Sequence, residues 1–166
     1  KPPFVPDNME HAKTVPLQPS MLSAGWRKLD PSEDMAKRFA HFMPEMWQAD
    51  RAGEKLSFSF RGTAAALYDI LGPDGAQVVV TLDGKQSAPR PRFDSYCSYH
   101  RIASLGIGSG LEDTVHTVTV EIHPDQPDRS SVTDKEKNKP DFDPAKYDGT
   151  VLRVASLMLI GDLVEE

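Results

Sequence analysis

The most regular pattern in the chain is the run Thr117-Val118-Thr119-Val120-Glu121-Ile122, in which every second residue carries a branched apolar side chain. Side chains of a β-strand point alternately to its two faces, so this run predicts a strand with one buried face. The same period of two recurs over residues 56–60 and 78–82. These three segments predict half-buried strands, which are typical of an all-β fold.

Turn signals lie between the expected strands. Gly72-Pro73-Asp74-Gly75 and Asp83-Gly84 are strong turn sequences, and Arg61-Gly62 predicts a break after the strand that begins at Leu56. Further strands are expected at residues 25–29, 63–71, 92–102 and 150–163, and a flexible glycine-rich loop at 106–110. Short strands joined by turns, without alternating long helices, predict an antiparallel β-sandwich.

One short helix is expected near the N-terminal part of the chain, over residues 31–42. Asp30 is a good N-cap residue, and Pro31 suits the first helical position. Apolar residues follow at helical spacing, at Met35, Phe39 and Phe42.

Two parts are predicted along the chain. Residues 1–22 are rich in proline and predict an extended linker, which leads us to expect that the chain was cut from a longer polypeptide. Residues 23–166 predict the β-sandwich domain, with a long polar loop at 123–149.

The composition is that of a soluble globular domain. The 166 residues are 39% hydrophobic and 27% charged, with a formal net charge of −6. This acidity argues against nucleic acid as a partner, and no apolar run is long enough to span a membrane. The single cysteine, Cys97, cannot form an internal disulfide, and we expect it to be a small buried residue of a strand.

A family resemblance is carried by six stretches, at residues 56–63, 68–75, 80–85, 93–101, 110–113 and 116–120. In this order they resemble the jelly-roll (galactose-binding-like) accessory domain of bacterial SGNH/GDSL-type hydrolases and, more broadly, carbohydrate-binding modules. The resemblance implies a secreted or periplasmic protein of polysaccharide degradation. It also implies a carbohydrate ligand and a catalytic domain of the same polypeptide as partners. No cofactor is expected, although the resemblance leaves room for a structural calcium ion.

The nucleophile motif of SGNH esterases is missing. Their Gly-Asp-Ser does not occur, since Gly161-Asp162 is followed by Leu163 and Asp94-Ser95 has no glycine before it. We therefore expect no catalytic residue in this chain. The leading hypothesis is a non-catalytic accessory module that binds carbohydrate. One alternative is a structural domain that packs on the catalytic domain and shapes its cleft, and another is an enzyme whose residues meet only in space.

The candidate ligand-binding residues are aromatic or can form hydrogen bonds with sugar hydroxyls. A strand over 92–102 would place Tyr99 and Arg101 on one face and Tyr96 and His100 on the other. An aromatic ring stacks on a sugar, and arginine or histidine donates to its hydroxyl groups. The alternative is that Tyr99 packs in the core. The full candidate set is Trp47, Tyr99, His100, Arg101, Arg61 and Asp69, with Trp26 as a second tryptophan to consider.

Three other features have mainly structural interpretations. His116 precedes the clearest strand and is expected to fix a turn. Arg90 and Arg92 form a small basic spot that suits a solvated loop or an acidic partner. The aspartates of the 123–149 loop lack EF-hand spacing and are offset by lysines, so they favour a solvated mobile loop over a calcium site.

Overall fold

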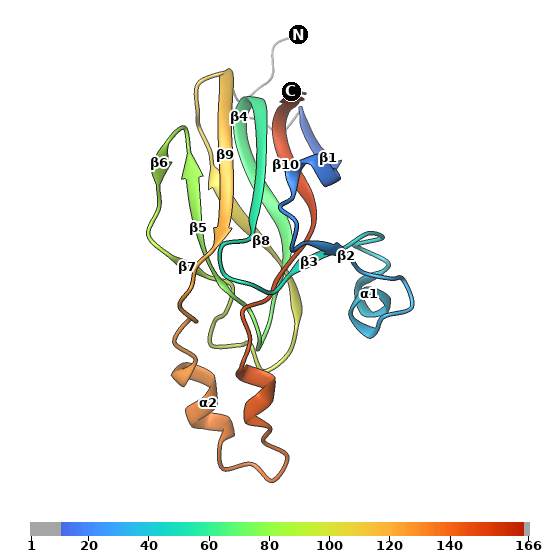
Figure 1. Cartoon of the computed structure of the whole chain (residues 1–166), viewed down its shortest axis with the longest axis vertical. Helices are drawn as coiled ribbons and strands as arrows, with labels where there is room; N and C mark the ends of the chain where they lie inside the picture. Colours follow the sequence, from blue (N-terminus) through green and yellow to red (C-terminus); the bar gives the residue numbers. More distant parts are fainter. Residues whose placement is uncertain (1–10, 165–166) are drawn as a thin grey trace, which may run out of the picture.

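The longest strand, β4 (Lys55–Leu71), organises the fold of the computed structural model, which describes residues 11–164 (Figure 1). The first half of β4 pairs with β9 (Thr114–Ile122), and its second half pairs with β8 (Arg101–Gly108). Along its other edge β4 pairs with β10 (Leu152–Val164), so both long strands contribute to the two layers.

β4 changes partner at a bend formed by two facing glycines. Gly62 lies opposite Gly161 of β10, beside a register shift between Ile160 and Gly161. A β-carbon on Gly62 would lie 2.1 Å from the carbonyl oxygen of Ile160, so the two backbones can approach this closely only because the residue is glycine. The break expected at Arg61-Gly62 is thus a bend inside one continuous strand.

The remaining strands extend the two layers. β5 (Gln77–Leu82) pairs with β9, with β6 (Lys85–Gln86) and with β7 (Arg90–Pro91). Beyond β10 lie β1 (Ala12–Pro16), β3 (Trp47–Ala49) and β2 (Arg27–Lys28). The helical segments are α1 (Asp34–Phe39), α2 (Ser130–Glu136) and the 3₁₀ turns η1 (Pro19–Met21) and η2 (Pro144–Tyr147). All pairings between these strands are antiparallel.

The main core fills the space between the layers with alternate residues of the strands. Val118, Val120 and Ile122 of β9 are buried as their spacing predicted, and they pack with Leu105 of β8 and Leu157 of β10. This arrangement confirms the predicted fold class, an all-β antiparallel sandwich with a short helix near the N-terminal part. Burial of apolar side chains on two facing layers is what stabilises such a fold.

α1 covers a second, smaller core on the outer face of the β10–β4–β8 layer. Phe39 and Met43 pack there against Ile70 and Ala155. The helix is shorter than the predicted span of 31–42, because the chain continues after Phe39 in turns. Phe42 consequently lies outside the helix and remains 61% exposed.

The strand expected at 92–102 is wrong over most of its length. Residues 95–98 form a turn, and β8 begins only at Arg101. The Asp94 carboxylate accepts the backbone N–H of Tyr96 at 2.9 Å, and the N–H of Cys97 donates to the Asp94 carbonyl at 3.0 Å. This local pairing competes with a strand. β8 instead extends through Gly106 and Gly108, where a loop was expected.

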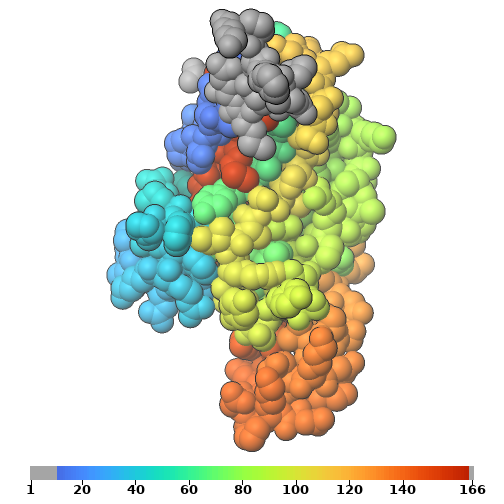
Figure 2. Space-filling view, turned by 180° about the vertical axis from the view of Figure 1, so that it is seen from behind, coloured from blue at the N-terminus to red at the C-terminus, as the bar shows by residue number. Residues whose placement is uncertain are grey.

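The polar segment 123–149 contains α2 and η2 as well as turns. Its apolar side chains Val132, Phe142 and Tyr147 pack with Phe93 and the buried Cys97 in a third cluster. The segment expected to be a long polar loop thus contains two short helical elements, and three of its apolar side chains are packed in one cluster. Figure 2 shows this segment at one end of the molecule and the α1 segment projecting from its side.

The start of the described chain packs against the sandwich. β1 pairs with β10 from Ala12 to Pro16, and Leu17 and Met21 are buried in the main core, so residues 12–21 pack as part of the sandwich. Residues 1–10 of the predicted linker lie outside the described residues. No helix within residues 11–164 has both the length and the hydropathy needed to cross a bilayer.

Candidate functional site

The turn Gly72–Gly75 is the centre of a polar network that includes the predicted site residue His100. The His100 ring packs against Gly72, where a β-carbon would come within 2.2 Å of it. His100 Nε2 donates to Asp74 Oδ1 at 2.8 Å. The ring is therefore largely engaged in fixing this turn to the start of β8.

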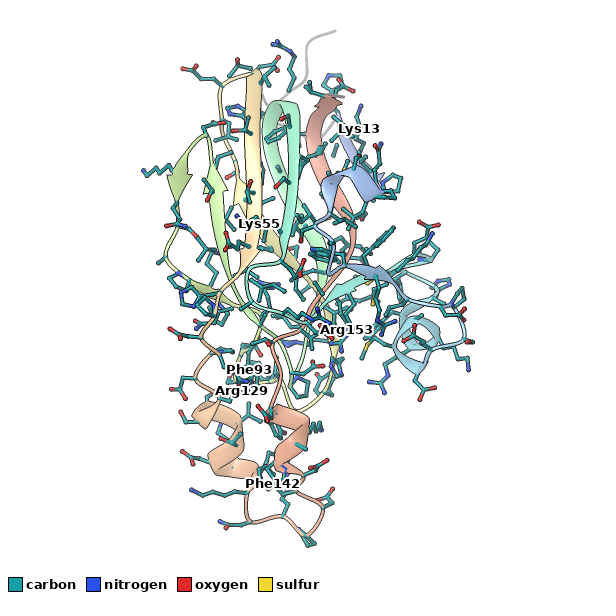
Figure 3. All side chains as sticks on the ribbon, viewed as in Figure 1. Lys13, Lys55, Phe93, Arg129, Phe142 and Arg153 are labelled. Atoms are coloured by element: carbon teal, nitrogen blue, oxygen red, sulfur yellow. The ribbon has the colours of Figure 1, made fainter. Side chains whose placement is uncertain are left out.

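Arg153 of β10, labelled in Figure 3, holds the same aspartate. Its guanidinium donates to both Asp74 oxygens, at 3.0 and 2.7 Å, and its Nε donates to Gln48 Oε1 at 2.8 Å. Burial raises the pKa of Asp74, but the hydrogen bonds from His100 and Arg153 outweigh it and hold the pKa well below its ordinary value. Asp74 is thus a fixed anion that joins its turn to Arg153 of β10 and to His100, the residue before β8.

Arg129 fixes this turn from its other side. It donates to the carbonyl oxygens of Pro73 and Gly75, both at 2.9 Å, and to that of Gly149 at 2.6 Å. Its guanidinium also lies 5.6 Å from the centre of the Phe93 ring (Figure 3). The charged groups on both sides of the turn are consequently used for structure.

Two tyrosines remain exposed next to this network. Tyr96 is 70% exposed and Tyr99 is 56% exposed, so Tyr99 does not pack in the core. The Arg101 guanidinium lies 5.8 Å from the Tyr96 ring centre and donates to the Asp94 carboxylate. We call Tyr96, Tyr99 and Arg101 the tyrosine rim. The prediction that Tyr96 and Tyr99 point to opposite faces of a strand is wrong, because both residues precede β8 and lie in or next to a turn.

Asp69 is fully buried and is not available to a ligand. Arg92 holds it with two hydrogen bonds, from Nε at 2.6 Å and from Nη2 at 2.9 Å. Burial raises the pKa of Asp69, and the charge of Arg92 opposes that rise. Arg92, expected in a solvated basic spot, is likewise buried.

The other predicted residues lie away from the tyrosine rim or inside the protein. Trp47 is partly buried against the main core, and Trp26 is only 8% exposed, so neither forms an open sugar platform. Arg61 is exposed, but it lies eight positions before Asp69 in β4, which at the usual rise per residue is about 26 Å. The structure therefore brings together Tyr99, His100 and Arg101 and separates Arg61 from them.

One sequence spacing resembles the Asp-x-x-His pair of SGNH esterases, at Asp113 and His116. The structure gives His116 another partner. Its Nδ1 donates to Asp83 Oδ2 at 2.7 Å and its Nε2 to the Glu112 carbonyl at 2.8 Å, so both nitrogens carry protons. The hydrogen bond to Asp83 raises the pKa of His116. The ring fixes a turn, as expected, and neither nitrogen is left to activate a nucleophile.

Residues 11–164 contain no group of three or more histidine, cysteine, aspartate or glutamate side chains arranged to hold a metal ion. Within the 123–149 segment the aspartates instead serve local roles. Asp128 accepts the N–H of Ser130 at 2.9 Å, and Asp143 accepts that of Ala145 at 3.0 Å.

A groove on the outer face of the β10–β4–β8 layer was missed by the sequence analysis. It has a volume of about 610 Å³, within the usual range for ligand sites. Segments far apart in the chain form it, so no local motif signals it. We call it the Phe42 groove, and the residues that matter most in it are Pro16, Phe42, Met43, Tyr68, Ser156 and Met158.

No protein-family model matches the sequence, and no curated protein gives a significant match to it. Solved structures share its fold. A two-domain esterase active on acetylated mannans, co-crystallised with mannopentaose, aligns with 99% of this chain at a TM-score of 0.64 and 12% identity. A family two carbohydrate esterase from Cellvibrio japonicus aligns with 92% of it at a TM-score of 0.50 and 12% identity.

These alignments cover only part of each esterase. The chain corresponds to 40% of the first and 34% of the second. Its solved structural neighbours thus include carbohydrate esterases, and it shares the fold of one part of them.

Proposed function

We propose that this chain is a non-catalytic accessory domain of an extracytoplasmic, polysaccharide-active esterase of the SGNH type, and that it binds carbohydrate. The observation that carries the proposal is the match of nearly the whole chain to 40% of a two-domain esterase. The missing Gly-Asp-Ser motif and the engaged ring of His116 support a role without catalysis. Secretion or export to the periplasm is part of the same proposal.

The tyrosine rim is the proposed contact surface. Two exposed phenol rings three residues apart offer faces on which sugar rings can stack, and their hydroxyl groups can exchange hydrogen bonds with sugars. Arg101 is held beside Tyr96 by Asp94, which reduces the entropy that its ordering would cost on binding. Binding at such an open surface is weak, and a tether to a catalytic domain raises its effective strength.

Affinity electrophoresis of the purified chain tests this proposal. Gels would contain acetylated mannan, xylan or a soluble glucan, and we expect at least one polymer to retard the chain. Tyr96→Ala and Tyr99→Ala should each weaken retardation several-fold. Val115→Ala, which removes another exposed apolar side chain at 43% exposure, serves as the matched control and should change nothing. Unchanged migration of the wild-type chain in every gel would contradict carbohydrate binding.

The alternative function is a structural domain that packs on the catalytic domain without binding sugar. Phe42 supports it, because a phenylalanine with 61% of its surface exposed is suited to burial against a partner. Under this alternative the chain migrates unchanged in every polysaccharide gel, and Phe42→Ala weakens its association with the separately produced catalytic domain.

A further inference from the structure

The turn that carries the two exposed tyrosines is mounted on a buried base. Cys97, which lies between Tyr96 and Tyr99, is fully buried and packs with Tyr147 of η2 in the third cluster. Figure 2 shows the stretch that leads into β8, in yellow, next to the 123–149 segment, in orange. The tyrosine rim therefore lies where the sandwich meets η2, and side chains of both parts border it.

Lys146 of η2 brings a positive charge to the rim. Its Nζ donates to the carbonyl oxygen of Ser98 at 2.5 Å and lies 5.7 Å from the centre of the Tyr147 ring. The carbonyl group of Ser98 is bonded to the backbone nitrogen of Tyr99, so the ammonium group lies beside the backbone of that tyrosine. The two contacts hold the lysine side chain in place, which reduces the entropy that its ordering would cost on binding.

This charge has no anionic partner in the described part of the chain. Lys146 is exposed, and none of the ion pairs there includes it. The nearest acids in sequence are engaged locally, because Asp143 caps the start of η2 and Asp148 accepts a hydrogen bond from Gln126 at 3.1 Å. Of the three N–H donors of the ammonium group, one is used by Ser98. The other two can bind a ligand.

Arg101 adds no second free charge to the rim, because its guanidinium is paired with Asp94. Lys146 therefore gives this surface one uncompensated positive charge. The whole chain, by contrast, has a formal net charge of −6. A local positive charge on an acidic chain directs an anionic ligand to that place.

A uronic acid matches this combination of groups. Its pyranose ring presents C–H groups that stack on an aromatic face, and Tyr99 is open enough to receive it. Its carboxylate accepts hydrogen bonds from the remaining donors of Lys146, and such charge-assisted bonds are about twice as strong as neutral ones. A neutral sugar would leave the charge unpaired, so this surface favours an acidic unit.

We propose that the tyrosine rim selects acidic polysaccharides, with a uronic acid ring stacked on Tyr99 and its carboxylate bound by the ammonium group of Lys146. This inference rests on the proposed function and names the substrate class of the same surface. It makes Lys146, which the sequence analysis did not select, the residue that determines specificity.

The test compares a xylan that bears glucuronic acid with the same xylan after chemical reduction of its carboxylates to alcohols, by isothermal titration of the purified chain. The two polymers differ only in the carboxylate. We expect the wild-type chain to bind the acidic polymer about three- to fivefold more tightly, the size expected of one exposed ion pair. An ionic strength of about 0.15 M screens the repulsion from distant acidic groups of the chain.

Three variants locate the preference. Lys146→Gln should abolish it, whereas Lys146→Arg keeps the charge and should retain most of it. Lys85→Gln is the matched control, because it removes another exposed lysine, on β6 and away from the 123–149 segment (Figure 1), and should leave the preference unchanged. The urea midpoint of unfolding should stay the same in all three variants, since both lysines are exposed.

The outcomes separate this inference from the proposed function. Equal affinity for the two polymers, or a preference that survives Lys146→Gln, overturns selection by Lys146 but leaves carbohydrate binding intact when Tyr99→Ala still weakens it. A preference reduced as much by Lys85→Gln as by Lys146→Gln reflects general charge attraction and also overturns the inference. No binding to either polymer, together with no retardation in the other polysaccharide gels, overturns both proposals.

Discussion

Replacement of Asp69 by alanine should destabilise the domain severely, although sequence reasoning made this residue a ligand contact. The substitution leaves the Arg92 guanidinium, whose side chain is 8% exposed, without the carboxylate that holds it at 2.6 and 2.9 Å. Breaking a buried ion pair from one side typically costs about 3–5 kcal/mol. Domains of this size are stable by only about 5–15 kcal/mol, so Asp69→Ala should lower the melting temperature by about 6–20 °C.

Urea unfolding followed by tryptophan fluorescence measures this loss, because Trp26 and Trp47 both pack in the main core. The matched control is Asp113→Ala, which removes an exposed carboxylate and should change stability by less than about 0.5 kcal/mol. The double replacement of Asp69 by leucine and Arg92 by methionine should recover most of the loss, because no unpaired charge then remains buried.

The reasoning would be refuted by a loss below about 1 kcal/mol for Asp69→Ala, or by a double variant no more stable than the single one. Either result would mean that water or another group satisfies Arg92.

The remaining predictions concern pH and backbone packing. Asp74→Asn should destabilise the domain at neutral pH, and stability that depends on Asp74 should disappear as the pH falls below about 4, because its pKa is lowered in the folded state. Folding raises the pKa of His116, so the stability that the protonated ring contributes is present below about pH 6.5 and is lost as the pH rises through the folded-state pKa. The urea midpoints of unfolding at pH 6 and pH 8 should therefore differ more in the wild-type chain than in His116→Gln. Gly62→Ala should lower the free energy of unfolding by about 1–3 kcal/mol in the same assay, because its β-carbon would clash with the backbone of β10. In Gly84→Ala the β-carbon would meet no atom within 4 Å, so this control measures only the backbone strain of a residue with positive φ.

The sequence predicts the strands well where the alternation of apolar residues, or a turn sequence, is not opposed by another local interaction. Alternation over 117–122 identifies β9, and the turn residues at 72–75 and 83–84 lie where strands end. It fails where a local side chain overrides the period, as when Asp94 caps a turn inside the expected strand at 92–102. It also fails where glycine permits a bend without ending a strand, as at Gly62.

The candidate site was predictable only in part, because its neighbours are distant in sequence. Tyr99, His100 and Arg101 could be selected as a cluster, yet only the structure shows that His100 is occupied by Asp74, which lies 26 residues away. The aromatic character of Trp47 gave no information on its burial. The Phe42 groove joins residues near 14–16, 42–45 and 156–158, and no pattern of one segment can indicate such a meeting.

The most direct test of the central claim is one titration series on the purified 166-residue chain, in which a panel of acetylated and unmodified polysaccharides is added and free acetate is measured in the same samples. A domain that recognises carbohydrate without cleaving it should give saturable heat with at least one polymer and release no acetate. The absence of heat with every polymer, or acetate released in proportion to the chain present, would contradict the account.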